Sequence, residues 1–317
     1  MPYEIAPAHA PYIAAITALK QERRAVILAH NYQTPEIFHG VADVRGDSLA
    51  LAQAATRVDA DAIIVCGVHF MAETVKVLNP DRTVIIPDAR AGCSLAESIT
   101  AEDVRQLRER YPGVPVVTYV NTSAAVKAES DICCTSGNAV EVVQSLGVGR
   151  VIFLPDEYLG QYVAAHTSVD LILWKGHCSV HERFSVQQIV AIRQQHPGIR
   201  VIVHPEVPWE VVQAADDSGS TEYIIKAVTN SPAGSIWAVG TEVHLVNRLA
   251  NQLAPDQTVI SLDRFGCLCS TMFRVSPNHL LWILEELVAG RVHNRIVVPD
   301  DQKHWTKVAL DRMLAIQ

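Results

Sequence analysis

Residues 170–178, DLILWKGHC, form a short apolar run that ends in a cysteine, and the sequence contains two further runs of this kind. These are TVIIPDARAGC (83–93) and TVISLDRFGCLC (258–269). Their last cysteines, Cys93, Cys178 and Cys269, recur at similar intervals along the chain. Strands and helices alternate in all α/β proteins, but that alternation does not explain a cysteine at the same place in each period. We therefore infer that the sequence contains three copies of one unit.

The sequence before each of these runs repeats as well. A β-branched segment with polar or aromatic residues at its end comes first: AVILAHNYQTPEI (25–37), VPVVTYVNTSAAV (114–126) and IRVIVHPEVPWEVV (199–212). A helix start that contains Ser or Thr follows: RGDSLALAQAA (45–55), CTSGNAVEVV (134–143) and SGSTEYIIKAV (218–228). A second strand comes next: DAIIVCGVHFMAETV (61–75), GRVIFLPDEYLGQYV (149–163) and GSIWAVGTEVHLV (234–246). This alternation is typical of βαβ units with parallel strands.

These patterns predict an α/β protein of three repeated β-α-β-α-β units, with parallel sheets around a pseudo-threefold axis and the active site at the centre. The predicted units are 1–92, 93–178 and 179–269, and the C-terminal segment 270–317 is expected to pack on the first. Ligands of parallel α/β sheets bind beyond the carboxyl ends of the strands. Polar residues at those ends should therefore surround one site: His30, Tyr32, Tyr119, Asn121, His204, Glu206 and the three cysteines.

The composition argues against several classes of protein. Of the 317 residues, 49% are hydrophobic and 19% are charged, which is typical of a chain with a large buried core. The net charge of -8 and the lack of a Lys/Arg run argue against nucleic-acid binding, which relies on phosphate neutralisation. The first residues show no basic segment followed by an apolar one, and no apolar run is long enough to cross a bilayer. We expect a cytoplasmic protein that binds neither nucleic acid nor a membrane.

The cysteine pattern favours a metal cluster. The chain has seven cysteines, an odd number that fits a disulfide framework poorly, and a reducing compartment disfavours disulfides. A structural zinc site takes four ligands, usually with C-x-x-C pairs, which this sequence lacks. An electron-carrying [4Fe–4S] cluster also takes four thiolates. Three thiolates would leave one iron open to act on a substrate as a Lewis acid, so three equivalent cysteines favour cluster chemistry.

Three other cysteines fit a structural role better, whereas Cys93, Cys178 and one of Cys267 and Cys269 follow their strands among Gly and polar residues, as ligands would. Cys66 lies inside an apolar strand, and Cys133 and Cys134 lead into a helix start. Free cysteine often behaves as a small buried hydrophobic residue. We therefore expect these three to belong to the core.

The helix starts have two interpretations. A helix N-terminus attracts phosphate or carboxylate, and Ser48, Ser136 and Ser220 would add hydroxyl donors there. The same residue types are also the preferred N-caps. Because three such starts are directed at one site, we expect an anionic ligand at two or more of them.

His204 and Glu206 place an imidazole and a carboxylate at one strand end. A carboxylate in a partly dehydrated pocket has a raised pKa and can act as a general base, so Glu206 is the candidate base. Four further residues lie near the predicted site and are candidates for supporting roles: His69, Glu73, His177 and His181.

Several long segments resemble the quinolinate synthase family, and together they run from about Ala29 to the C-terminal helix. They are AHNYQTPEI, GDSLALA, CGVHFMAETVKVLNP, PDARAGCSLAE, YVNTSAAVKA, CTSGNAVEVV, HPEVPWEVV, GSTEYII and CSTMFRVSPNHLLW. The resemblance implies a three-domain fold around one [4Fe–4S] cluster. It also implies a transferase that condenses iminoaspartate with dihydroxyacetone phosphate, releasing phosphate and two waters, to make quinolinate for NAD biosynthesis. A transient contact with the enzyme that produces iminoaspartate is a further implication.

The resemblance also implies roles for individual residues. The cluster cysteines of the family correspond to Cys93, Cys178 and Cys269. Its substrate-binding positions correspond to His30, Tyr32, Ser48, Tyr119, Val120, Asn121, Ser136, His204, Pro205, Glu206, Ser220 and Thr221. Among these, Glu206 would abstract protons, and Tyr119, His30 and His204 would move protons or orient the triose.

One motif departs from the family pattern. Some members carry C-x-x-C-x-x-C near the C-terminus, whereas this chain has Cys267-Leu268-Cys269. Cys269 is assigned as the ligand because Cys-x-x-Met, here Cys269 to Met272, matches the family. A disulfide between Cys267 and Cys269 would be strained, which argues against a redox-active pair.

Two other functions fit the same residues. The first is a cluster-dependent hydro-lyase of the aconitase type acting on a small hydroxy acid, which turnover of dihydroxyacetone phosphate would separate from a quinolinate synthase. The second is a non-catalytic cluster carrier or redox sensor, which would need a fourth protein ligand.

Overall fold

The computed structural model describes residues 5–316 of the protein. In it the chain forms two compact units. Among the described residues, unit 1 contains Ser94–Leu268 and residues 305–316, and unit 2 contains residues 5–93 together with Cys269–His304.

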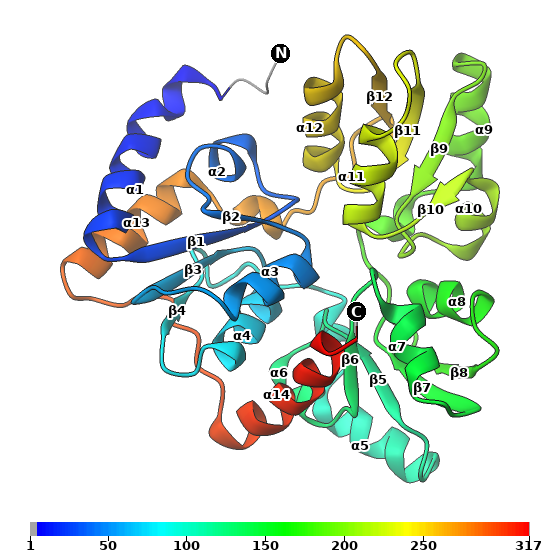
Figure 1. The fold of residues 1–317 in the computed structure, drawn as a ribbon, viewed down its shortest axis with the longest axis horizontal. Coiled ribbons are helices and arrows are strands. Elements are labelled where there is room, and N and C mark those ends of the chain that lie inside the picture. The colour runs from blue at the N-terminus through cyan, green and yellow to red at the C-terminus, as the bar shows by residue number, and fades with distance from the viewer. Residues whose placement is uncertain (1–4, 317) are drawn as a thin grey trace. The chain divides into compact units, whose positions relative to one another are not determined.

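Unit 2 contains one parallel sheet of four strands. In chain order they are β1 (Ala25–His30), β2 (Val44–Gly46), β3 (Ala62–Cys66) and β4 (Thr83–Ile85). Their order in the sheet is β2-β1-β3-β4, so β1 and β3 are central (Figure 1). All residues of β3 are buried, as expected for a parallel sheet that helices cover on both faces.

Unit 1 contains two sheets of the same kind. The first has the order β6-β5-β7-β8, with β5 (Val116–Tyr119), β6 (Ile132–Cys134), β7 (Arg150–Leu154) and β8 (Asp170–Leu173). The second has the order β10-β9-β11-β12, with β9 (Arg200–Val203), β10 (Asp217–Ser218), β11 (Ile236–Gly240) and β12 (Thr258–Ser261). All of these strand pairs are parallel.

The three sheets therefore share one strand order, which confirms the predicted α/β fold with three repeated units. The repeat differs from the prediction in one respect, because each sheet has four strands instead of three. The additional strands are β2, β6 and β10, which have only two or three residues each. Strands this short carry no recognisable alternation of apolar and polar residues.

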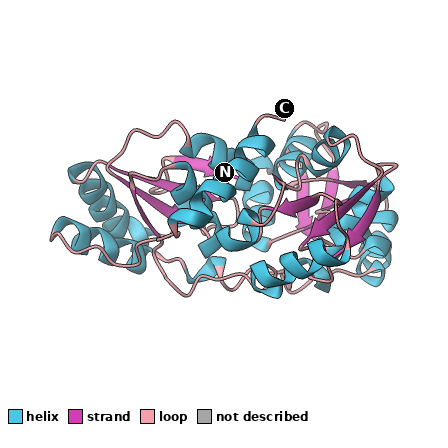
Figure 2. Cartoon of the chain, turned by 90° about the horizontal axis from the view of Figure 1, so that it is seen from below, coloured by secondary structure: helices cyan, strands magenta, loops and turns pink. Residues whose placement is uncertain are grey.

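Helices surround the strands in each unit (Figure 2). Unit 2 contains α1 (Ala10–Glu22), α2 (Pro35–Phe38), α3 (Ser48–Ala55), α4 (His69–Leu78) and α13 (Pro277–Val288). Here α1 packs against α13, and α3 packs against α4. Unit 1 contains α5 (Ala101–Arg110), α6 (Ala124–Ala128), α7 (Ala139–Ser145), α8 (Glu157–Ala165), α9 (Val186–Gln195), α10 (Trp209–Ala214), α11 (Thr221–Thr229) and α12 (Val243–Leu253). Among the described residues, no helix combines the length and the apolar character needed to cross a membrane.

The C-terminal segment divides between the two units. Its first part, Cys269–His304, belongs to unit 2 with the first sheet. Its last helix, α14 (Asp300–Leu314), ends in unit 1, where Thr306 donates to the carbonyl of Ala124 at 2.7 Å. The sequence had suggested that all of 270–317 packs on the first repeat, whereas its end lies on the second.

The three predicted ligand cysteines begin the same local structure. A 3₁₀ turn starts three residues after each of them: η2 (Ala96–Ser98) after Cys93, η3 (His181–Arg183) after Cys178, and η4 (Met272–Arg274) after Cys269. A helix follows each turn: α5, α9 and α13. Cys267 does not stand at this distance from η4, so Cys269 is the structural equivalent of the other two.

Candidate functional site

The first and third repeats end their first strand with the same histidine turn. In unit 2 the backbone N–H of Tyr32 donates to Nδ1 of His30 at 3.2 Å. In unit 1 the backbone N–H of Glu206 donates to Nδ1 of His204 at 3.3 Å. Both imidazoles are therefore held against the backbone of their own turns.

The second repeat has Tyr119 and Asn121 at the corresponding positions, at the end of β5. Tyr119 is buried, and Val120 is held by the hydrogen bond from its N–H to the carbonyl of Cys134 at 2.9 Å. The buried Oδ1 of Asn121 has no hydrogen-bond partner. A buried acceptor without a partner is costly, so this oxygen is suited to a donor on a ligand.

Glu206 lies within a buried polar cluster of unit 1. Its Oε2 is 2.6 Å from Nδ1 of His181 and 3.6 Å from Nδ1 of His204. Its Oε1 accepts from the amide of Asn121 at 3.3 Å, and Tyr119 also hydrogen-bonds to the carboxylate. The structure thus brings four predicted site residues of unit 1 together: Tyr119, Asn121, His204 and Glu206.

The pKa of Glu206 is lowered, not raised. Burial alone raises it, but the charges of His181 and His204 and the hydrogen bonds from His181 and Tyr119 outweigh burial and bring the pKa to about 2. The expectation of a raised pKa was wrong because it considered dehydration without the neighbouring imidazoles. Glu206 is therefore a carboxylate at neutral pH.

Asp156 is a second buried carboxyl group in the same unit. Its Oδ1 accepts from the N–H of Leu159 at 2.8 Å, at the start of α8. Burial raises the pKa of Asp156 well above its usual value, and the charge of Glu206 raises it further, although backbone N–H groups that include that of Cys178 oppose the shift. The surroundings thus shift the two acids in opposite directions, lowering the pKa of Glu206 and raising that of Asp156.

His181 is the residue of this cluster that the sequence identified only as a neighbour. It is the first residue of η3, and its ring stacks on that of His204 with centroids 4.6 Å apart. Besides Glu206, its Nδ1 lies 3.3 Å from Sγ of Cys178, and its Nε2 lies 3.0 Å from Oγ1 of Thr241. The C-x-x-H spacing from Cys178 was the available signal, because a residue at that position starts the 3₁₀ turn.

The other neighbouring candidates have less specific surroundings. On α4 of unit 2, His69 and Glu73 lie one turn apart at 3.9 Å, and the side chain of His69 is exposed. In unit 1, His177 pairs with Glu157 at 2.9 Å and stacks on Tyr158. Neither arrangement involves the Glu206 cluster.

Exposure separates the cysteines into two classes. Cys93, Cys178 and Cys269 are half-buried, whereas the other cysteines of the chain, Cys66, Cys133, Cys134 and Cys267, are buried. Burial raises the pKa of the Cys66 and Cys134 thiols. It also raises the pKa of the Cys133 thiol, to about 12. In all three cases burial disfavours the thiolate form, which is the form that binds metals. The three accessible thiols are the three at equivalent positions, so the donor set fits a three-cysteine cluster.

Cys178 also belongs to a mixed group in unit 1. Its Sγ, a ring nitrogen of His181 and a carboxylate oxygen of Glu206 all lie within 4.8 Å of one another. Such a set can hold a metal ion. In this structure His181 and Glu206 instead hydrogen-bond directly to each other.

The serine-containing helix starts differ from one another. Ser220 is the N-cap of α11, where its hydroxyl accepts from the N–H of Tyr223 at 3.3 Å, and Thr221 follows it. In unit 2, Asp47 is the N-cap of α3 and Ser48 is the first helical residue. Ser136 precedes its helix, because α7 begins only after the N-cap Asn138. Capping thus accounts for Asp47 and Ser220, while Ser136 lies in the turn before α7, which the N–H of Asn138 closes by donating to the carbonyl of Thr135 at 3.2 Å.

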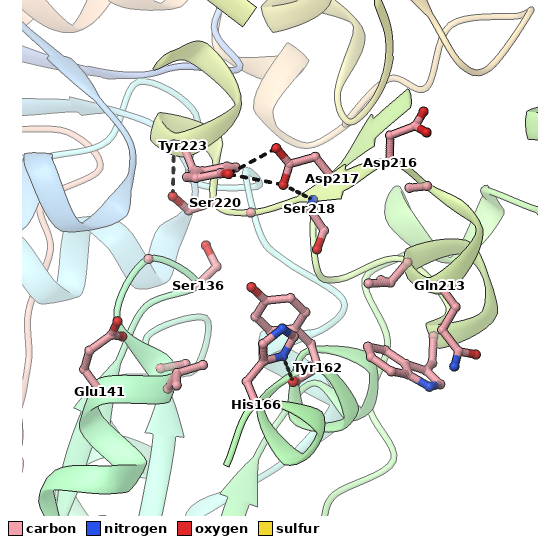
Figure 3. Close-up of a pocket in the computed structure, with 17 residues that line it drawn as sticks. Ser136, Glu141, Tyr162, His166, Gln213, Asp216, Asp217, Ser218, Ser220 and Tyr223 are labelled. Carbon is pink, nitrogen blue, oxygen red and sulfur yellow. Dashed lines mark hydrogen bonds between the residues drawn. The ribbon is translucent and has the colours of Figure 1, made fainter. Parts of the chain in front are cut away.

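A pocket of about 600 Å³ opens beside Ser136 and Ser220 within unit 1 (Figure 3). Beside Ser220, the hydroxyl of Tyr223 donates to the carboxylate of Asp217 at 3.1 Å (Figure 3). Three carboxylates line the pocket, those of Glu141, Asp216 and Asp217, and none of its described lining residues is Lys or Arg. The described lining therefore offers an anion hydroxyl groups but no Lys or Arg cation.

The predicted site residues divide between the two units. His30, Tyr32, Ser48, Cys93 and Cys269 belong to unit 2, and the others belong to unit 1. Pro205 is buried in the His204 turn. A single centre formed by all of these residues remains a prediction.

Comparison with known proteins identifies the family. The family model described as quinolinate synthetase A protein matches residues 14–315. Quinolinate synthase from Sinorhizobium fredii is 62% identical over 310 residues, which cover 98% of this chain and 84% of that protein. Quinolinate synthase 2 from Mesorhizobium japonicum is 54% identical over 312 residues, which cover 98% of this chain and 93% of that protein. The chain therefore belongs to the quinolinate synthase A family of NAD biosynthesis enzymes.

Proposed function

We propose that this enzyme condenses iminoaspartate with dihydroxyacetone phosphate to give quinolinate, phosphate and two waters. We further propose that Cys93, Cys178 and Cys269 hold one [4Fe–4S] cluster that serves this reaction. The observation that carries the proposal is the equivalence of the three half-buried cysteines, each of which precedes the same 3₁₀ turn by three residues. The similarity to named quinolinate synthases supports quinolinate as the product.

The three thiols fit the cluster by their chemistry. Thiolates are the usual ligands of iron–sulfur clusters, and the competing thiols of this chain are buried. A cluster with three protein ligands would supply one open iron as a Lewis acid for a substrate oxygen or nitrogen.

The Glu206 cluster is proposed to handle protons. Glu206 is ionised and is the nearest carboxylate to both imidazoles, so it can accept a proton from substrate carbon or nitrogen. A carboxylate with so low a pKa is a weak base by itself. His181, at 2.6 Å, would hold the carboxylate in place by donating a hydrogen bond to it, while His204 would orient the reacting groups.

Polar groups around this cluster are proposed to bind the substrates. Asn121 would accept a hydrogen bond from a substrate N–H or O–H at its unpartnered Oδ1. Ser136 and Ser220, which line the pocket, and Thr221, the first residue of α11, would bind phosphate or carboxylate, with the N-terminus of α11 adding favourable charge. In unit 2, His30, Tyr32 and Ser48 would contact the triose.

An assay on anaerobically purified protein tests this function. Iron and sulfide are counted, and quinolinate formation from iminoaspartate and dihydroxyacetone phosphate is then measured. We expect a filled cluster together with quinolinate. Dehydration of a hydroxy acid without any quinolinate would favour the aconitase-type reaction, and a filled cluster without turnover of either kind would favour a carrier.

A further inference from the structure

The two cysteine turns of unit 2 are joined by one ion pair. Nε of Arg274, in η4, donates to Oδ2 of Asp88 at 2.9 Å. Asp88 follows β4 and lies before Cys93, whereas Arg274 lies after Cys269. The pair therefore connects two segments that are far apart in sequence and that both carry a proposed cluster ligand.

Asp88 organises the turn that leads to Cys93. Its Oδ1 accepts from the backbone N–H of Arg90 at 2.8 Å, and its carbonyl accepts from the N–H of Ala91 at 3.0 Å. The N–H of Gly92 then bonds to the carbonyl of Arg90 at 2.9 Å. The carboxylate of Asp88 thus stabilises this turn with one oxygen and forms the ion pair with Arg274 with the other.

Arg274 belongs to an equally compact turn. The carbonyl of Cys269 accepts from the N–H of Phe273 at 3.0 Å, and the carbonyl of Thr271 accepts from the N–H of Arg274 at 3.3 Å. Sγ of Cys269 lies 3.4 Å from the hydroxyl of Thr271. A displacement of Arg274 would therefore move the backbone that carries Cys269.

Gln33 holds the same turn from another side. Gln33 is 1% exposed and follows the His30–Tyr32 turn. Its backbone N–H donates to the carbonyl of His30 in that turn. Its Nε2 donates to the carbonyl of Met272 at 3.2 Å and lies 3.7 Å from the sulfur of Met272. The Cys269 turn is thus tied both to the Cys93 turn and to the end of β1.

The Asp88–Arg274 pair differs from a typical surface ion pair. The side chain of Asp88 is 6% exposed and that of Arg274 is 35% exposed. Burial raises the pKa of Asp88, but the backbone hydrogen bond from Arg90 and the charges of Arg274, Arg90 and His279 lower it below the usual value. A desolvated, hydrogen-bonded pair of this kind restricts geometry more than an exposed one does.

We propose that Asp88 and Arg274 are a positioning pair, with Gln33 as a second tie, that sets the Cys93 and Cys269 turns for the cluster before it binds. This inference rests on the proposal that both cysteines are cluster ligands. Hydrogen-bond partners of metal ligands commonly change metal affinity about 10–100-fold when they are removed. The pair would act in the same way, by keeping the two turns from moving apart when they are empty.

Arg274→Met removes the ion pair and keeps most of the aliphatic stem, whereas Arg274→Lys keeps a charge. The matched control is Arg291→Met, which breaks the Arg291–Glu286 pair of the same unit, a pair that includes no residue of either cysteine turn. Hydrogen exchange is measured on the cluster-free proteins, and the rate of cluster loss to a chelator is measured on the loaded proteins under anaerobic conditions.

Arg274→Met should accelerate exchange in both 88–93 and 269–275 and speed cluster loss about 10–100-fold. Arg274→Lys should restore most of both properties, and Arg291→Met should change neither. Asp88→Asn should behave like Arg274→Met.

Unchanged exchange in 88–93 together with parental cluster retention in Arg274→Met would overturn the inference. Loss of protection throughout the unit 2 sheet would also overturn it, because the pair would then serve general stability. If the parent takes up no cluster, the proposed function fails, and exchange in the cluster-free proteins still decides whether the pair couples the two turns.

Discussion

Nδ1 of His181 lies 2.6 Å from the carboxylate of Glu206, and both side chains are almost fully buried. The contact joins a residue that follows Cys178 to a residue at the end of β9. It explains how a carboxylate can stay ionised after burial, because the imidazole supplies both a hydrogen bond and positive charge. It also links the proposed proton chemistry to the turn of a proposed cluster ligand.

Replacing Glu206 by Gln should lower turnover by about 10²–10⁴-fold, the usual contribution of a positioned general base. The substitution keeps size and hydrogen bonding but removes the proton acceptor, so iron content should hardly change. Steady-state kinetics and iron counts measure the two effects. Glu157→Gln, which changes a half-buried glutamate on α8 of the same unit, is the control. Turnover within a few-fold of the parent would show that Glu206 stabilises the structure of its turn and does not act as the base.

Replacing His181 by Phe should change the pH dependence of kcat/KM. The variant keeps an aromatic ring at this position, but it lacks the charge of His181 and the hydrogen bond to Glu206. Burial then raises the pKa of Glu206 from about 2. Because the carboxylate is the active form, the decline of activity in acid should begin at higher pH in the variant than in the parent.

His177→Phe is the control for that experiment, because His177 pairs with Glu157 and not with Glu206. Its acid limb should match that of the parent. An unshifted limb in His181→Phe would mean that another group holds Glu206 in its ionised form.

Changing Cys93, Cys178 or Cys269 singly to Ser should abolish both the cluster and the activity. Cys66→Ser and Cys133→Ser should keep both, since these thiols lie buried within strands. Absorbance and iron counts provide the measurement. A complete cluster in Cys269→Ser but none in Cys267→Ser would reverse the assignment of the third ligand.

Adding a methyl group at Gly176 should disturb the approach to Cys178. A Cβ there would lie 2.5 Å from both the carbonyl of Pro155 and the hydroxyl of Ser98. Gly176→Ala should therefore lower the free energy of unfolding by about 1–3 kcal/mol, measured by denaturant titration. Gly149→Ala is the control, because a Cβ at Gly149 meets nothing within 4 Å. Equal free energies of unfolding for the two variants would mean that the chain around Pro155 and Gly176 accommodates the added methyl group without destabilisation.

The sequence predicted the repeated fold because its signal was long and threefold. It also predicted Tyr119, Asn121, His204 and Glu206 as one group, since all lie at the ends of parallel strands. It missed β2, β6 and β10, which are too short to show a periodic pattern. It also did not predict that α14 ends in unit 1, because the hydrogen bond from Thr306 to Ala124 joins residues that are far apart along the chain.

The sequence predicted which residues form the site better than it predicted their pKa values and contacts. The short distance between His181 and Glu206 cannot be read from the sequence, which therefore suggested a raised pKa for Glu206, whereas the structure lowers it. It also gave no sign of the Asp88–Arg274 pair, whose partners are far apart along the chain. Three-dimensional distances determine both features.

We propose that Cys93, Cys178 and Cys269 hold a four-iron cluster whose fourth iron is open to substrate. Mössbauer spectroscopy of the anaerobically prepared, isotope-labelled protein is the decisive measurement of this arrangement. We predict one iron site that differs from the other three and that alone changes when dihydroxyacetone phosphate is added. Four equivalent irons that do not respond to the substrate would contradict the claim.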